Sequence, residues 1–530
     1  MRSTETVVVL VALATVVAAF AGRLRVPAPS LLVAVGLIVG LLPGAPVVHV
    51  PPSVVSLVVL PPLLYAASEE LSWRDLRAVW RPVAVLAVGL VLASAAAAAA
   101  VAMAVASLSV SMAFVLGAVL ASTDPVAVSA LGRRLSLPAR VQALVQAESL
   151  FNDGTSLVLF QIAVSFAVGT AGLSVTGALL HGVAEFVLLA GGGVLCGAAV
   201  ASGAIVLRRR ITDPVLETVA ALITPYVAYL LGATLHVSGV TAVIVAGLVV
   251  GVRRTRITTA QTRLQLHSVY QTVLFLLESV VFALIGLELP TLVRDLGHTG
   301  RWPAAALAVT GTLIAIRVAW VFPLHAFSQR RRGEHRPSWP VPAVVSWAGT
   351  RGVVPLAAAL SIPLSTSRGS ALPQRDLVLV LAAAAIVISL LVQGFTLEPL
   401  ARLAGFGPAP AGPRHEETTA RLRMAEAGLA RLDELAEDDA APDEVIDRLR
   451  GGLLARIGST QARLDRSIDT SRTGRAEKDR TEKELRGDLI TAEHAELSRL
   501  YDAGTISAAT RRRLQRNLDL ETTRLTEGPH

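Results

Sequence analysis

Two acidic residues in one apolar stretch have side chains and a spacing that could bind an ion. Residues 148–153 read ESLFND. On an α-helix, Ser149 and Asp153 share a face because they are four residues apart. Glu148 and Asp153 lie about 140° apart around the helix axis. Asp153 can therefore face a binding site while Glu148 faces a cationic partner, and Arg317 in another apolar stretch is the obvious candidate. The alternative is that both acids have a purely structural role. We favour that alternative for Glu148 but not for Asp153.

A second acid, Asp124, stands before a proline inside another apolar stretch, in the triplet Thr123-Asp124-Pro125. Proline lacks a backbone donor and disfavours helix at the residue before it, so the triplet predicts a broken helix. Carbonyl groups freed by the break could coordinate a cation, and Asp124 would lie near the N-terminus of the second half-helix, where the dipole favours negative charge. The alternative is a simple proline kink with the aspartate in a water-filled vestibule.

An arginine flanked by glycines, in Gly349-Thr350-Arg351-Gly352, predicts a second interrupted helix. Arg351 and Arg317 both lie within apolar stretches. Charges within a membrane are costly, so each of them is a functional hypothesis by default.

The elements that must position these residues are transmembrane helices. Of the 530 residues, 53% are hydrophobic and only 17% are charged, and the mean hydropathy is +0.59. Several apolar runs approach the roughly 20 residues that cross a bilayer. We predict an all-α polytopic membrane protein with thirteen spans, at about residues 5–22, 27–43, 53–68, 82–106, 109–131, 141–169, 176–207, 214–235, 238–252, 271–290, 303–326, 340–362 and 376–399.

The arginines predict the orientation of these spans. Residues 1–400 contain 26 arginines and no lysine, and 19 of the arginines fall in one alternating set of loops, against five in the other set. The positive-inside rule places the first set in the cytoplasm, with the N-terminus outside and the C-terminus inside. The basic charge belongs to these short loops and therefore does not indicate nucleic-acid binding.

The two predicted breaks occupy corresponding places, because the fifth and twelfth spans are each the fifth element of a six-span block. Paired interruptions of this kind are typical of transporters built from inverted repeats. We expect the two breaks to cross near the bilayer centre, with Asp124 and Arg351 balancing the half-helix ends.

The domain division, the lysines and the single cysteine further narrow the possible functions. Residues 1–405 form the predicted membrane domain, and 406–530 form a helical cytoplasmic domain after a proline-rich hinge. The only lysines, Lys478 and Lys483, do not follow glycine, so a Walker A phosphate loop is absent. The single cysteine, Cys196, allows no intrachain disulfide. No cofactor is predicted.

Several motifs together resemble those of the sodium/proton antiporters of the NhaP/NHE type, over roughly residues 5–400. They are Thr123-Asp124-Pro125, the ESLFNDG of 148–154, Ser238-Gly239, the FALIG of 282–286 and Gly349-Thr350-Arg351-Gly352. The resemblance implies a homodimer in the bacterial plasma membrane. Each subunit would have thirteen helices, with a dimerisation domain packed beside a six-helix core that contains crossed broken helices.

The resemblance also implies roles for single residues. Asp153 would bind cation and proton in turn, with Asn152 beside it, and Na⁺ would be coordinated by Asp153, Ser149 and the Thr123 carbonyl, with Asp124 acting directly or through water. Glu148 and Arg317 would form an ion pair between core helices, and Arg351 would offset helix dipoles.

Two positions depart from the family pattern. Some members carry an acid in the third span, where this chain has Ala66 and Ala67, and Glu69 or Glu70 could replace it. Many relatives have Ala-Glu where this chain has Gly232-Ala233.

The expected activity is electroneutral exchange of one monovalent cation (Na⁺, with Li⁺ or K⁺ as alternatives) for one proton by alternating access, serving pH and sodium homeostasis. The protein would be a secondary transporter rather than an enzyme. Other hypotheses are a potassium/proton antiporter, a cation channel, for which no carbonyl-lined filter sequence is visible, and an intramembrane hydrolase that uses Asp124 and Asp153.

Overall fold

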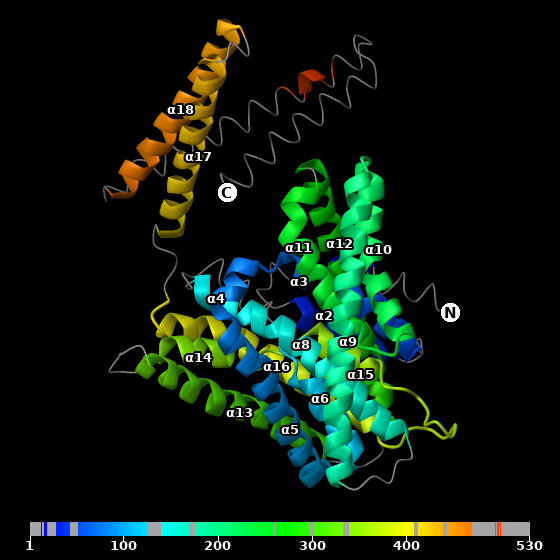
Figure 1. Cartoon of the computed structure of the whole chain (residues 1–530). Coiled ribbons are helices and arrows are strands. Elements are labelled where there is room, and N and C mark those ends of the chain that lie inside the picture. The colour runs from blue at the N-terminus through cyan, green and yellow to red at the C-terminus, as the bar shows by residue number, and fades with distance from the viewer. Residues whose placement is uncertain are drawn as a thin grey trace. The chain divides into compact units, whose positions relative to one another are not determined.

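The computed structural model describes residues 12, 15–17, 28–42, 51–124, 139–169, 175–258, 260–296, 301–331, 339–406, 412–437, 442–468, 493, 495–497 and 499. In this described part every regular element is a helix, and the one β-type contact is an isolated bridge between Ser365 and Ala371. The all-α class predicted from the sequence is therefore confirmed. The chain divides into two compact units, Met1–Pro408 and Ala409–His530 (Figure 1).

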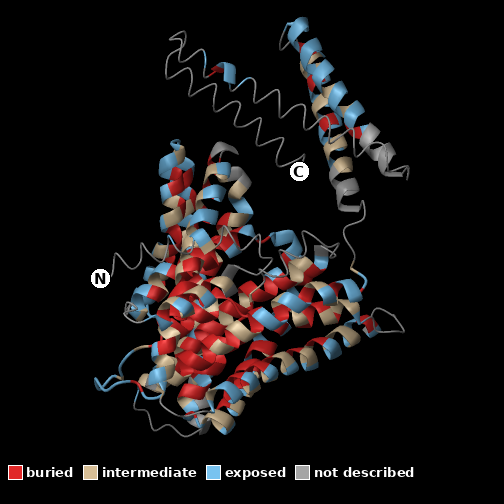
Figure 2. Cartoon of the chain, turned by 180° about the vertical axis from the view of Figure 1, so that it is seen from behind, coloured by how far each residue is buried: buried red, intermediate tan, exposed pale blue. Residues whose placement is uncertain are grey.

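The first unit is a bundle of packed helices whose buried residues concentrate in its middle (Figure 2). In chain order they are α2 (Ala28–Leu41), α3 (Pro52–Glu70), α4 (Trp73–Ala84), the π-helical segment η1 (Val85–Leu90), α5 (Val91–Ala106), α6 (Val110–Ala121), α8 (Ala139–Val168), α9 (Val175–Arg210), α10 (Pro214–Thr234), α11 (Gly239–Ile257), α12 (Ala260–Asp295), α13 (Trp302–Arg331), α14 (Pro340–Trp347), α15 (Val353–Leu360) and α16 (Arg375–Leu403).

Eight helical stretches among the described residues are long and apolar enough to cross a membrane, and two shorter apolar helices cover Leu31–Leu41 and Val110–Ala121. The predicted span at 5–22 and the second half of the span at 109–131 fall largely outside the described residues. A multi-pass membrane protein is therefore supported, while the count of thirteen and the inverted repeats stay predictions.

Helix starts follow from local side-chain chemistry. Ser238 caps α11, because its Oγ accepts the Thr241 N–H at 3.2 Å. Asp213 caps α10, accepting the N–H groups of Val215 at 2.7 Å and Leu216 at 3.0 Å. Such caps satisfy donors that have no partner within the helix. The Ser-Gly pair at 238–239 thus fixes where α11 begins.

Glycines bring several helices into close contact. A Cβ added at Gly193 or Gly197 of α9 would overlap the carbonyl groups of Ser238 and Ala242, at and just after the start of α11. Gly36 of α2 and Gly286 of α12 meet in the same way. Small residues that let backbones approach are typical of helix contacts in membranes. Gly193 and Gly197 therefore serve the packing of α9 against α11.

The second unit contains two packed helices, α17 (Gly412–Glu437) and α18 (Asp443–Ile468). Ala425, Leu432 and Ile446 are buried. Arg450 donates to Asp433 at 2.8 Å, which links the two helices at their surface. Most of residues 469–530, the rest of the predicted helical domain, lie outside the described residues.

Candidate functional site

Two non-helical segments form the centre of the site: residues 122–124, called the first interruption, and residues 348–352, called the second interruption. Helix α6 ends at Ala121 and residues 122–124 leave the helix, while residues 348–352 separate α14 from α15. The Asp124 N–H donates to the Thr350 carbonyl at 2.7 Å, and the Thr350 hydroxyl donates to the Asp124 carbonyl at 2.9 Å. Two segments that lie 226 residues apart in sequence are therefore joined directly.

Asp153 lies on α8 beside the first interruption. Its side chain is buried, and the Ser122 hydroxyl donates to its Oδ1 at 2.5 Å. Asp153 forms no ion pair within the part of the chain that the structure describes. A buried carboxylate without a cationic side chain is costly in its charged form. Binding a proton or a metal cation would remove that cost.

Three further residues predicted for the site connect the first interruption to α8. The Thr123 N–H donates to Asn152 Oδ1 at 3.3 Å, and Asn152 Nδ2 donates to Thr123 Oγ1 at 2.5 Å. The hydroxyls of Thr123 and Ser149 lie 3.3 Å apart. The structure therefore brings Thr123, Ser149, Asn152 and Asp153 together on the α6 side of α8, as their helical spacing implies.

Glu148 faces a different side of α8 and meets Arg317 of α13. The guanidinium donates to both carboxylate oxygens, Nη1 at 2.5 Å and Nη2 at 3.0 Å, and both side chains are at most 3% exposed. Arg317 also donates to the Val345 carbonyl near the end of α14. Gly349 leaves room for this arginine, since an added Cβ would lie 2.5 Å from its Cδ. The pair therefore links α8, α13 and the second interruption.

Arg351 and Asp124 lie at the ends of half-helices. Arg351 Nη1 donates to the carbonyl of Ser122, just after the C-terminus of α6, at 2.8 Å. The Asp124 carboxylate lies against Gly352, the residue before α15. A cation at a helix C-terminus and an anion at a helix N-terminus are both favoured by the helix dipole.

Four polar residues at this site were not predicted: Ser122, Thr350, Ser389 and Gln393. Ser389 and Gln393 are buried on α16. Their signal in the sequence was a pair of polar residues four apart in an otherwise apolar helix. Ser122 could have been found as the polar neighbour of the triplet at 123–125.

Glu69 and Glu70, proposed as replacements for the acid that some family members carry in the third span, form no hydrogen bond or ion pair with Asp153 in the described part of the chain. Glu69 is buried at the end of α3, with Oε1 3.7 Å from Nε of Arg254 on α11, and Glu70 is exposed. The described residues contain no group of three or more His, Cys, Asp or Glu side chains that could hold a metal ion. The oxygen atoms around Asp153 belong to carboxylate, hydroxyl and carbonyl groups, which hard cations prefer as ligands.

Comparison with known families and proteins gives a consistent result. The family described as sodium/hydrogen exchanger, transmembrane, matches residues 9–403. The chain is 33% identical over 530 residues to an uncharacterized Na⁺/H⁺ exchanger of Mycobacterium tuberculosis, covering 98% of this chain and 96% of that one. It is 30% identical to the Na⁺/H⁺ antiporter ApNhaP of Aphanothece halophytica, covering 84% and 83%.

A sodium, potassium, lithium and rubidium/H⁺ antiporter of Bacillus subtilis is 29% identical over 69% of this chain and 56% of its own length. Among solved structures, the sodium proton antiporter MjNhaP1 from Methanocaldococcus jannaschii has a similar fold. The TM-score is 0.60 at 21% identity, covering 76% of this chain and 99% of that one.

Proposed function

The chain belongs to the sodium/hydrogen exchanger family, and we propose that it exchanges Na⁺ for H⁺ across the bacterial plasma membrane, with Li⁺ or K⁺ as further substrates. The observation that carries this proposal is Asp153, a buried carboxylate that has hydroxyl and amide neighbours but no ion pair among the described residues. Potassium/proton exchange is the second candidate, favoured by the Bacillus subtilis relative, whose name includes potassium.

Coupling follows from competition for this one carboxylate. Moving an uncompensated charge through an apolar environment is unfavourable, and either a proton or a monovalent cation neutralises Asp153. The loaded site can then move between the two membrane faces while the empty, charged site cannot. Exchange by alternating access is the result, as in transporters whose binding site lies between moving bundles.

The proposed Na⁺ ligands are the Asp153 carboxylate, the Ser149 hydroxyl and the Thr123 backbone carbonyl, with Asp124 acting directly or through water. Asn152 holds Thr123 by two hydrogen bonds and so fixes the interruption against α8. We add Ser122 to this set, because its hydroxyl reaches the Asp153 carboxylate directly.

We further propose that one proton exchanges for one monovalent cation, so that the cycle moves no net charge. Asn152 cannot carry a proton in place of a second acid, and both Glu148 oxygens are occupied by Arg317. The protein would be a homodimer of thirteen-helix subunits, with the N-terminus outside and residues 406–530 in the cytoplasm. Its physiological role would be pH and sodium homeostasis.

Proton flux in proteoliposomes tests the proposal. Purified protein is reconstituted with a pH-sensitive dye inside the vesicles, and Na⁺, Li⁺, K⁺ or Rb⁺ is added in turn across an imposed pH gradient. We expect Na⁺ to dissipate the gradient with saturation kinetics, and protein-free vesicles in the same lipid give the background. Cation flux that proceeds without any proton movement would identify a channel and contradict the proposal.

A further inference from the structure

We propose that Ser389 and Gln393 of α16 are positioning residues that hold the α14–α15 interruption, and through it the cation site, in binding geometry. This role rests on the proposed antiport function. It adds two residues that touch neither the Asp153 carboxylate nor any other proposed cation ligand in the described contacts.

The two side chains serve the backbone groups that the interruption leaves without helical partners. Gln393 Nε2 donates to the Trp347 carbonyl, at the end of α14, at 3.3 Å. Ser389 Oγ accepts the Arg351 N–H, just before α15, at 3.1 Å. Ser389 Oγ also donates to Gln393 Oε1 at 2.6 Å. Because helix ends expose carbonyl and N–H groups, the pair closes both sides of the break from one face of α16.

Burial makes these hydrogen bonds matter. Ser389 is 2% exposed and Gln393 is 1% exposed. Polar groups at that depth have no bulk water to replace a lost partner, so an unpaired N–H or carbonyl is costly. The hydrogen bonds of Ser389 and Gln393 therefore restrict residues 348–352 to one backbone arrangement.

The restricted segment in turn determines where the first interruption lies. The Arg351 guanidinium holds the Ser122 carbonyl at 2.8 Å, and Thr350 makes two hydrogen bonds with the Asp124 backbone. The Ser122 hydroxyl then reaches Asp153. A continuous chain of hydrogen bonds runs from α16 through both breaks to the carboxylate, so releasing α16 would shift the proposed cation ligands.

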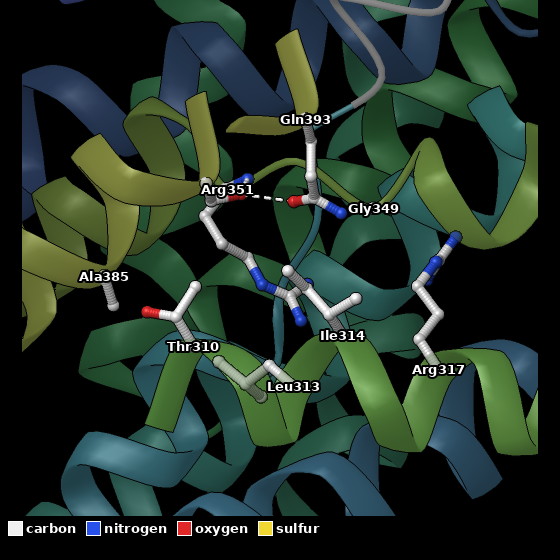
Figure 3. Close-up of a pocket in the computed structure, with 9 residues that line it drawn as sticks. Thr310, Leu313, Ile314, Arg317, Gly349, Arg351, Ala385 and Gln393 are labelled. Carbon is white, nitrogen blue, oxygen red and sulfur yellow. Dashed lines mark hydrogen bonds between the residues drawn. The ribbon is translucent and has the colours of Figure 1, made fainter. Parts of the chain in front are cut away.

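A small cavity beside the pair provides space for such a shift. It has room for about one water molecule and is lined by Ser389, Gln393, Arg351 and residues of α13 that include Thr310 and Ile314. Figure 3 shows the Arg351 side chain extending toward α13, with Gln393 beside its backbone. Tight packing alone does not hold Arg351 in place on this side. The hydrogen bond that its backbone N–H donates to Ser389 therefore contributes to its position.

Helix α16 also offers a matched control. Thr396, three residues after Gln393, accepts the indole N–H of the same Trp347 at 2.7 Å and is exposed. Thr396→Val removes a hydrogen bond to the Trp347 side chain but leaves the backbone of the interruption untouched. This variant therefore shows the effect of losing a contact between α16 and α14 without loss of the hydrogen bonds that hold the break.

The test compares Ser389→Ala, Gln393→Leu, the double variant, Ser389→Thr and Thr396→Val in proteoliposomes across a series of pH values. We expect each disruptive single variant to raise the half-saturating Na⁺ concentration about fivefold, the fold-change equivalent to one buried hydrogen bond. The pH of half-maximal rate should shift as well. The double variant should match the larger single effect, Ser389→Thr should retain most of the wild-type affinity, and Thr396→Val should resemble wild type.

Wild-type Na⁺ affinity and pH profile in both Ser389→Ala and Gln393→Leu would overturn the positioning role. If Gln393→Leu does not fold, Gln393→Glu replaces it with nearly the same shape. A carboxylate there cannot donate to the Trp347 carbonyl and would draw the Arg351 guanidinium away from Ser122, so at least the same rise in half-saturating Na⁺ is expected.

Amide hydrogen exchange distinguishes failure of this inference from failure of the proposed function. If the wild type shows no cation-dependent proton flux, the antiport proposal fails, but the Arg351 amide should still exchange faster in Ser389→Ala than in Thr396→Val. Equal exchange of that amide in the two variants would refute the positioning of the interruption by α16, whatever the protein transports.

Discussion

The interrupted helices around Asp153 and a second region around Arg208 both bury charged side chains, but they stabilise them differently. Arg208, near the end of α9, pairs with Glu217 of α10 at 3.3 Å and donates to Thr258 after α11 at 2.9 Å. Glu69 of α3 lies beside Arg254 of α11. In this second region the carboxylates have arginine partners.

Around Asp153 the partners are different. Backbone groups at the end of α6 form hydrogen bonds with the side chains of Arg351, Thr350 and Asn152. Asp153 accepts a hydrogen bond from a hydroxyl and has no arginine partner among the described residues. The second region lies at the ends of α3, α9, α10 and α11, and none of these four helices is interrupted along its length. Buried ion pairs between continuous helices suit a fixed structure, whereas a carboxylate that has no arginine partner can exchange its ligand. Four predictions test this contrast.

Removing the charge of Asp153 should have the largest effect. Asp153→Asn keeps the shape of the side chain but is always neutral and cannot take up a proton in exchange for a cation. We therefore expect cation-dependent proton flux to be abolished while the protein still inserts and dimerises. Flux in proteoliposomes and size-exclusion chromatography measure the two parts. Flux comparable to wild type would place the exchanging group elsewhere.

Breaking the Glu148–Arg317 pair should mainly reduce stability. Truncating either partner leaves a buried charge, which costs about 3–5 kcal/mol. Thermal unfolding of Glu148→Gln, Arg317→Met and the double variant gives the coupling, and the double variant should lose less than the sum of the single losses. Strict additivity would mean that the two side chains do not depend on each other.

A smaller effect is expected at Glu217, in the second region. Glu217 accepts one hydrogen bond from Arg208, at 3.3 Å, whereas Glu148 accepts two from Arg317. The loss of stability in Glu217→Gln should therefore be smaller, about 1–3 kcal/mol. The half-saturating Na⁺ concentration of the folded protein should stay at the wild-type value, because Glu217 belongs to continuous helices. A loss of Na⁺ affinity without a loss of stability would break the contrast between the two regions.

The smallest expected effect is that of voltage. If one proton exchanges for one cation, the initial rate of sodium-driven proton flux should not change when valinomycin and a potassium gradient set the membrane potential. The measurement uses Na⁺, since K⁺ can itself be a substrate. A steady transport current on solid-supported membranes would show that a second group, with Asp124 as the first candidate, also carries a proton.

The sequence by itself determined the features that depend on local geometry. Helical spacing placed Glu148 and Asp153 on different sides of α8, because 100° per residue holds along any α-helix. Glycines beside Arg351 located the break between α14 and α15, and the proline after Asp124 predicted the loss of helix at 122–124, because those residues act on the local backbone. Apolar length identified the membrane unit. These signals act over a few residues and need no tertiary contact.

Only the tertiary structure decided which groups meet at the breaks. The hydroxyl that donates to Asp153 belongs to Ser122, and the hydroxyl of Ser149, on the same face of α8 as Asp153, contacts Thr123. The non-helical segments have no repeating geometry to set side-chain directions, so their orientation depends on partners far along the chain. Ser122 is held by Arg351, 229 residues away, and Arg351 in turn by Ser389 on α16. Periodicity along one helix cannot encode such distant partners, because they become neighbours only when the helices pack.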